Sequence, residues 1–178
     1  MAHSGDVIEN PCTGERIVFL RTAADTGGEF LLMEYAGRPG LQGPPAHIHV
    51  EQQERFEVME GAVGFRVAGH EQTLRAGGSA VVPPGAGHTF WNAGDGELRM
   101  RIELRPALDM ETLFETNFRL GREGKTNERG RGGLLQDALL AHEYGFFLAF
   151  PPVPLQRPVI RLMASVARWR GLRARYDE

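Results

Sequence analysis

The pattern of apolar and polar positions predicts β-strands over most of the first hundred residues. The clearest alternation covers residues 98–105, where four apolar side chains are separated by charged ones. Such a two-residue period indicates a half-buried strand, because successive side chains of a strand point to opposite faces. Short antiparallel strands with regular turns are typical of a sandwich or barrel. Further strands are expected at residues 17–20, 30–35, 63–67, 72–74 and 79–82, with Gly, Pro and Asn turn signals between them.

Helical spacing replaces this alternation after Pro106. Asp109 is a favourable N-cap for a first helix, and a second helix is expected at 134–144, where Gly145 would end it. A third, arginine-rich helix is expected to follow Pro158, a residue that suits the first turn of a helix. The chain therefore changes from strands to helices at about two thirds of its length.

These elements predict a mainly β chain of three parts. We expect an N-terminal arm at residues 1–14, a single antiparallel β-barrel at 15–106, and a helical extension at 107–178. The extension would pack on the barrel or on the partner of a dimer. A chain of 178 residues is long enough for one domain with its own core.

Composition and charge narrow the classes of partner. The formal net charge of −3 is small and does not favour nucleic acid. Cys12 is the only cysteine, which excludes an internal disulfide and favours a reducing compartment. Neither a charged-then-apolar leader nor an apolar run near the ~20 residues needed for a membrane span is present, so we expect a cytoplasmic protein. The arginine-rich C-terminal helix leaves contact with a membrane surface as an alternative.

Candidate chemistry is concentrated in two short segments. His47 and His49 are two residues apart, so on a strand both imidazoles would point to the same side. Glu54 begins the next expected strand, and His88 begins a later one after a Pro/Gly-rich turn. Four potential ligands from three strands would converge if the sheet closes on itself. The pattern therefore predicts a mononuclear metal site inside a β-barrel.

Apolar side chains share the faces of these ligands. Glu54 lies on the same strand face as Phe56 and Val58, and His88 lies on the same face as Phe90. We expect Phe56, Val58, Phe65 and Phe90 to line the barrel and thereby the substrate pocket. Three other histidines, His3, His70 and His142, fall in an arm, a turn and a helix and are not expected to bind metal.

Both segments resemble the sequence motifs of the cupin superfamily. The first motif matches at His47, His49, Glu54 and Gly61, although Leu41 stands where the motif usually begins with glycine. The second motif matches at Gly77, Pro83, Gly85, His88 and Asn92. The resemblance covers about residues 15–105 and is to small single-domain cupins of the quercetinase-like type. It implies a double-stranded β-helix, or jelly roll, with His47, His49, Glu54 and His88 as metal ligands, and a homodimer.

A site of this kind would hold one divalent transition metal ion. Imidazole nitrogens with one carboxylate oxygen suit Fe, Mn, Ni, Co, Cu or Zn better than Ca or Mg. Four protein ligands leave one or two positions at which water, O2 or a substrate can bind. The resemblance further implies that Glu54 can act as a catalytic base. Asn92 is interpreted as a residue that stabilises a turn rather than as a partner of the metal ligands.

Three hypotheses for function follow. The first is a metal-dependent dioxygenase that acts on a small enolic or aromatic substrate in the barrel. The second is another enzyme on the same site, such as a decarboxylase, lyase or isomerase. A sugar-phosphate isomerase would need inward basic residues, whereas Arg99, Arg101 and Arg105 fall on the charged outer face of their strand. The third is a non-catalytic barrel that binds a small molecule.

Overall fold

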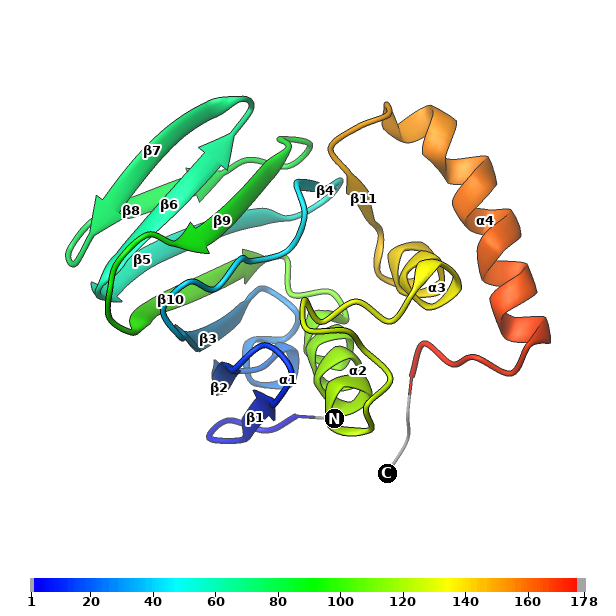
Figure 1. Ribbon diagram of the computed structural model, residues 1–178, viewed down its shortest axis with the longest axis horizontal. Helices are drawn as coiled ribbons and strands as arrows, with labels where there is room; N and C mark the ends of the chain where they lie inside the picture. The colour runs from blue at the N-terminus through cyan, green and yellow to red at the C-terminus, as the bar shows by residue number, and fades with distance from the viewer. Residues whose placement is uncertain (1, 176–178) are drawn as a thin grey trace.

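The computed structural model describes residues 2–175, so the last three residues of the predicted extension lie outside it. Within this range the strands form two antiparallel sheets. The six-stranded sheet has the order β1 (Val7–Asn10), β2 (Glu15–Arg21), β3 (Leu31–Gly37), β10 (Leu98–Arg105), β5 (Gln53–Glu60) and β8 (Ser79–Val82). The five-stranded sheet has the order β11 (Phe146–Leu148), β4 (His47–His49), β9 (His88–Asn92), β6 (Ala62–Val67) and β7 (His70–Arg75). Figure 1 shows these sheets as the β-rich half of the molecule.

The main hydrophobic core contains the apolar faces of both sheets. The alternation predicted for β10 is confirmed, since Leu98, Met100, Ile102 and Leu104 are buried and the charged residues that alternate with them are exposed or half-buried. β10 lies in the middle of its sheet, where it pairs with β3 on one side and β5 on the other. The prediction of a mainly β, antiparallel jelly-roll fold is thereby confirmed.

The prediction of an irregular arm at residues 1–14 is wrong for residues 7–10. Residues 7–10 form β1, which pairs with β2 so that Asn10 faces Glu15 across the turn. The sequence analysis predicts no strand in this segment. β1 is an edge strand whose side chains are mostly exposed, so its sequence lacks a clear apolar alternation.

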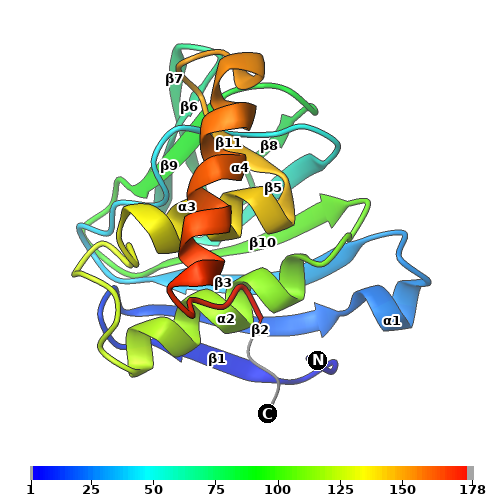
Figure 2. The same cartoon turned by 90° about the vertical axis from the view of Figure 1, so that its right-hand side faces the viewer.

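Three longer helices follow the sheets, as the sequence predicts. They are α2 (Met110–Arg122), α3 (Leu134–Tyr144) and α4 (Val153–Trp169). α3 has the predicted bounds, and Gly145 ends it in the left-handed conformation at φ 68°. A separate apolar cluster joins α3 to α4, where Ala164 and Ala167 are fully buried. In Figures 1 and 2 these two helices lie to one side of the sheets, with β11 between them and β4.

The predicted start of the last helix is wrong. α4 begins at Val153 rather than after Pro158, so Pro154 occupies its first turn and Pro158 lies inside it. Proline suits a first turn because the missing N–H has no helical partner there. Pro158 gives up only one bond, to the carbonyl of residue 154, and the helix continues past it. No helix within residues 2–175 is both long and apolar enough to cross a membrane.

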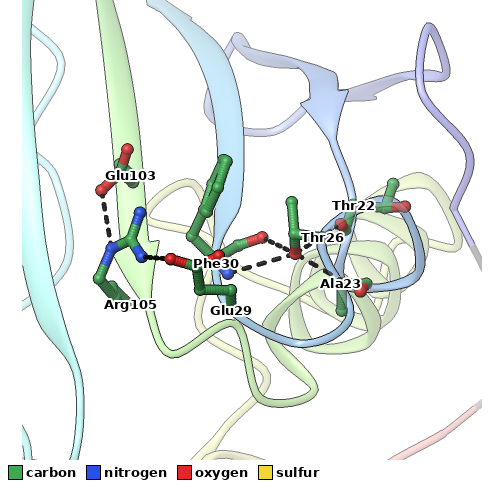
Figure 3. A network of polar contacts seen from close by, with 7 residues as sticks. All are labelled: Thr22, Ala23, Thr26, Glu29, Phe30, Glu103 and Arg105. Atoms are coloured by element: carbon green, nitrogen blue, oxygen red, sulfur yellow. Dashed lines mark hydrogen bonds and ion pairs between the residues drawn. The ribbon is translucent and has the colours of Figure 1, made fainter.

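A short helix, α1 (Ala23–Thr26), is tied to β10 through a polar network (Figure 3). The Thr26 hydroxyl donates to the Phe30 carbonyl at 2.6 Å, and the Arg105 guanidinium lies 4.8 Å from the centre of the Phe30 ring. Arg105 also pairs with Glu29 and Glu103. This network fixes the turn before β3 at the outer surface of the sheet.

Candidate metal centre

The four predicted metal ligands converge at one place. His47, His49, Glu54 and His88 each offer one ligand atom, and these atoms lie within 4.8 Å of one another. His47 Nε2 lies 3.1 Å from His49 Nε2, and His88 Nε2 lies 2.5 Å from Glu54 Oε2. Three of the four residues are buried, and His47 is partly exposed. The predicted convergence of these side chains is therefore confirmed.

The two sheets supply these side chains from opposite sides of the core. β4 and β9 carry the histidines in the five-stranded sheet, and β5 carries Glu54 in the six-stranded sheet. His47 and His88 are directly opposed in the β4–β9 pair, which places both rings on one face. The N–H of Gly85 donates to the His49 carbonyl at 2.8 Å and ties the turn before His88 to β4.

Backbone carbonyls orient two of the imidazole rings. His47 Nδ1 lies 2.9 Å from the Pro45 carbonyl, and His88 Nδ1 lies 3.2 Å from the Ala86 carbonyl. Because a carbonyl can only accept, we assign the proton to Nδ1 in each ring and the lone pair to Nε2. Both Nε2 atoms face the group. This is the tautomer through which imidazole binds a metal.

Burial and neighbouring charges set the protonation states of the group. Burial lowers the pKa of His47 to about 3 and also lowers the pKa of His49. Burial alone would raise the pKa of Glu54, but the contact with His88 and the charge of His49 lower it to about 2. Burial opposes protonation of His88, yet the Glu54 carboxylate outweighs burial and raises the His88 pKa. At neutral pH the group therefore offers a carboxylate and the neutral imidazoles of His47 and His49, and a cation would displace the proton that Glu54 favours on His88.

The donor set fits a transition metal ion. Nitrogen and oxygen ligand distances of about 2.0–2.2 Å place two ligand atoms at most about 4.4 Å apart. The ligand atoms of the group lie within 4.8 Å of one another, so small side-chain movements would bring all four onto one ion. Glu54 Oε2 and His88 Nε2 are buried and make no aligned hydrogen bond, although they approach each other closely. A cation between them would satisfy both atoms. The four residues could thus hold one ion, and the donor types do not select among Fe, Mn, Ni, Co, Cu and Zn.

The predicted pocket-lining residues lie in the hydrophobic core. Phe56, Val58 and Phe65 are at most 1% exposed, and Phe90 is 7% exposed. The Phe56 ring packs 4.8 Å from the Phe65 ring and 6.3 Å from the His88 ring, measured between centroids. These side chains form an apolar floor beside the ligands, and their contact with a substrate stays a prediction.

Asn92 stabilises a turn, as the sequence analysis expects. Its side-chain nitrogen lies within hydrogen-bond distance of the carbonyls of Gly37, Arg38 and Gly96, and its oxygen accepts from the Gly94 N–H. None of these partners is a member of the ligand group. The same holds for His3, His70 and His142, which lie outside that group among the residues described.

Sequence reasoning missed one element at the site. β11 pairs with β4, so that Phe146 faces His49 and Leu148 faces His47. The apolar run at residues 146–150 was visible in the sequence. Its pairing partner lies about a hundred residues earlier, and no local pattern marks that contact.

Comparison with known proteins agrees with this geometry. Residues 34–104 match a family model described as the cupin domain. The chain is 29% identical over 121 residues to a protein named oxidoreductase iacF from Pestalotiopsis fici. This alignment covers 64% of this chain and 59% of that protein. It is 41% identical over 54 residues to probable oxidoreductase virH from Hypocrea virens, which covers 30% of this chain and 25% of that protein. The chain therefore spans less than two thirds of either relative.

Solved structures show the same fold. One neighbour is a predicted oxalate decarboxylase from Thermotoga maritima, with a TM-score of 0.52, 18% identity, and coverage of 60% of this chain and 98% of that chain. Another is an RmlC-like cupin from Shewanella frigidimarina, with a TM-score of 0.50, 23% identity, and coverage of 58% and 86%. At these identities the likeness concerns the fold alone. Residues 34–104 therefore resemble the cupin domain in sequence, and the solved structures share its fold.

Proposed function

We propose that this protein is a metal-dependent oxidoreductase of the dioxygenase type that acts on a small enolic or aromatic substrate. The observation that carries the proposal is the group of three histidines and Glu54, in which His47 is partly exposed. A metal ion held there would keep coordination positions open on the His47 side. The matched curated relatives, both named as oxidoreductases, support the reaction class.

A bound metal would supply a Lewis acid and a site for O2 beside the substrate. The protein's residues supply the rest. The carbonyls of Pro45 and Ala86 hold two ligand rings in place, and the apolar floor that includes Phe56 excludes water. Glu54 is the only carboxylate in the group, so it is our candidate for accepting a proton from a substrate hydroxyl. Such a transfer would turn an enol or phenol into its more electron-rich anion.

The distribution of basic residues argues against a phosphorylated substrate. Arg99 and Arg101 are exposed on the outer face of β10, and Arg99 pairs there with Glu34. The inner face of the same strand is apolar. An anionic phosphate would thus meet no guanidinium from β10 on the ligand side. This favours a substrate of low charge over a sugar phosphate.

Metal content is the first test. Protein purified without a metal-affinity tag would be analysed for transition metals as wild type, as His47→Ala, and as His70→Ala. His70 is an exposed histidine outside the ligand group and serves as the matched control. We expect near-stoichiometric metal in the wild type and the control, and its loss in His47→Ala. Wild-type protein that takes up no metal, even after reconstitution with Fe, Mn, Ni and Zn salts, would refute the proposal.

Oxygen consumption then separates the reaction classes. The metal-loaded protein would be screened in an oxygen electrode with enolic and phenolic compounds, with Glu54→Gln as the impaired variant. Turnover with O2 uptake supports the dioxygenase. Release of CO2 or isomerisation without O2 uptake would instead indicate the decarboxylase or isomerase alternative, and binding without turnover would indicate a non-catalytic barrel.

A further inference from the structure

The helical extension contributes a strand directly beside the ligand-bearing strand. β11 lies at the edge of the five-stranded sheet and pairs antiparallel with β4, as Figure 1 shows. In this register Leu148 faces His47, and His47 in turn faces His88 on β9. Directly opposed residues of antiparallel strands place their side chains on the same face. Leu148 therefore belongs to the row of side chains that contains two of the proposed ligands.

Leu148 is an unusual member of this row. It is 46% exposed, whereas His88 is 1% exposed. Its neighbour His47 is the one partly exposed ligand. The row thus runs from the buried interior at His88 to an apolar side chain open to solvent at Leu148. A single exposed leucine needs no explanation by itself, but this one stands at the open side of the ligand group.

The backbone of Leu148 is held firmly in place. Gln156 of α4 is buried, and its side-chain oxygen accepts from the Leu148 N–H at 3.1 Å while its nitrogen donates to the Leu148 carbonyl at 2.8 Å. The next residue, Ala149, donates to the Ala46 carbonyl at 2.8 Å. The same Ala149 packs against Gly87, where an added Cβ would lie 3.0 Å from the Ala149 methyl. The strand is thus fixed to β4, to α4 and to the turn before His88.

We propose that Leu148 is a specificity-determining residue that contacts the apolar body of a substrate bound at the metal. This inference rests on the proposed function, because it requires an occupied metal site. The substrate class it favours is a flat or branched hydrocarbon body that carries the metal-binding oxygens at one end. The extension would then select the substrate, while the cupin domain supplies the ligands.

Two probes of different size test this role. Azide reaches a metal without touching the rim, whereas 4-nitrocatechol brings an aromatic body with its two oxygens. Their dissociation constants would be measured by isothermal titration calorimetry on metal-loaded wild type, Leu148→Ala and Leu148→Met. Leu155→Ala is the matched control, since Leu155 is 65% exposed on α4 and lies outside this row.

Leu148→Ala is expected to raise the dissociation constant of 4-nitrocatechol about tenfold, which corresponds to about 1.4 kcal/mol. The dissociation constant of azide is expected to stay within about twofold of the wild-type value. Leu148→Met, which keeps an apolar side chain of similar size, is expected to retain wild-type affinity for both probes. Leu155→Ala is expected to change neither. Elemental analysis of every variant accompanies the titrations.

Three outcomes would overturn the inference. If Leu148→Ala binds both probes more weakly by the same factor, the residue supports the metal site and does not select the ligand. If 4-nitrocatechol binds Leu148→Ala as tightly as it binds wild type, Leu148 does not contact the ligand. If the wild-type protein holds no metal, the proposed function fails and the inference fails with it, and this result is distinguished from the other two by the elemental analysis.

Discussion

Replacement of Asn92 by alanine should destabilise the fold and leave the metal centre intact. Asn92 is 5% exposed and belongs to the second motif segment, four residues after His88. Its side-chain nitrogen lies 2.9 Å from the Gly96 carbonyl and 3.0 Å from the Arg38 carbonyl, and its oxygen accepts from the Gly94 N–H at 2.9 Å. These bonds join the turn after β9 to the loop after β3.

The magnitude follows from the number of bonds lost. Each protein hydrogen bond contributes about 1 kcal/mol net to stability. Asn92→Ala removes two well-placed donations and one acceptance and leaves the partners buried or partly buried, so we expect a loss of about 3 kcal/mol. A loss of that size is a large share of the ~5–15 kcal/mol that stabilises a typical domain.

Urea denaturation of the metal-free protein would measure this loss, and elemental analysis of the folded fraction would measure the metal. Asn92→Asp is an informative companion, because a protonated aspartic acid keeps the acceptor for the Gly94 N–H and can make only one of the two donations. We expect its stability to lie between wild type and Asn92→Ala at a pH at which the carboxyl is protonated. A stability change below about 1 kcal/mol, together with loss of metal, would show instead that Asn92 serves the ligands.

Three further predictions concern separate parts of the chain. Burial lowers the pKa of His47 to about 3, whereas the pKa of histidine in an unfolded chain is about 6.5. Below pH 6.5 the unfolded chain therefore binds a proton that His47 does not bind in the folded protein. The free energy of unfolding of the metal-free protein should therefore fall on acidification. At pH 5 this fall should be about 2 kcal/mol smaller in His47→Gln than in wild type, as measured by urea denaturation with a chelator present. Gly64→Ala should destabilise the fold by about 1–3 kcal/mol, because the new methyl group would overlap the cross-strand Trp91 ring. The double variant Gly64→Ala/Trp91→Thr should recover much of this stability, as measured by thermal denaturation. If the predicted homodimer forms through the exposed apolar side chains of α4, Leu162→Glu should be monomeric when its mass is measured by light scattering after size-exclusion chromatography. A monomeric wild-type protein would contradict the prediction of a dimer.

The candidate ligands could be predicted because their spacing is local. The two-residue interval between His47 and His49 decides a common face whatever the rest of the chain does. Glu54 likewise shares a buried face with Phe56 and Val58, as the alternation in β5 predicts. The alternating burial of β10 follows from the same rule. Where one face of a strand is buried, local sequence is sufficient to assign the inward side chains.

Elements held by long-range contacts could not be predicted in this way. β1 is an edge strand with little apolar alternation, and its existence depends on pairing with β2. The start of α4 lies within a Pro-rich segment that local rules interpret as a break. The buried Gln156 stabilises this region by binding the backbone of Leu148, and no propensity scale contains that contact. In each case a tertiary partner outweighs the local preference.

The position of β4 links the extension to the metal centre. β4 is only three residues long, and it pairs with β9 at the single pair His47–His88. On its other edge all three residues pair with β11, including His49 with Phe146. The strand that carries two of the four proposed ligands is thus held mainly by residues outside the matched cupin domain. A change in β11 would displace His47 and His49 together, while His88 and Glu54 remain on longer strands of their own. We infer that the extension is needed for the geometry of the centre.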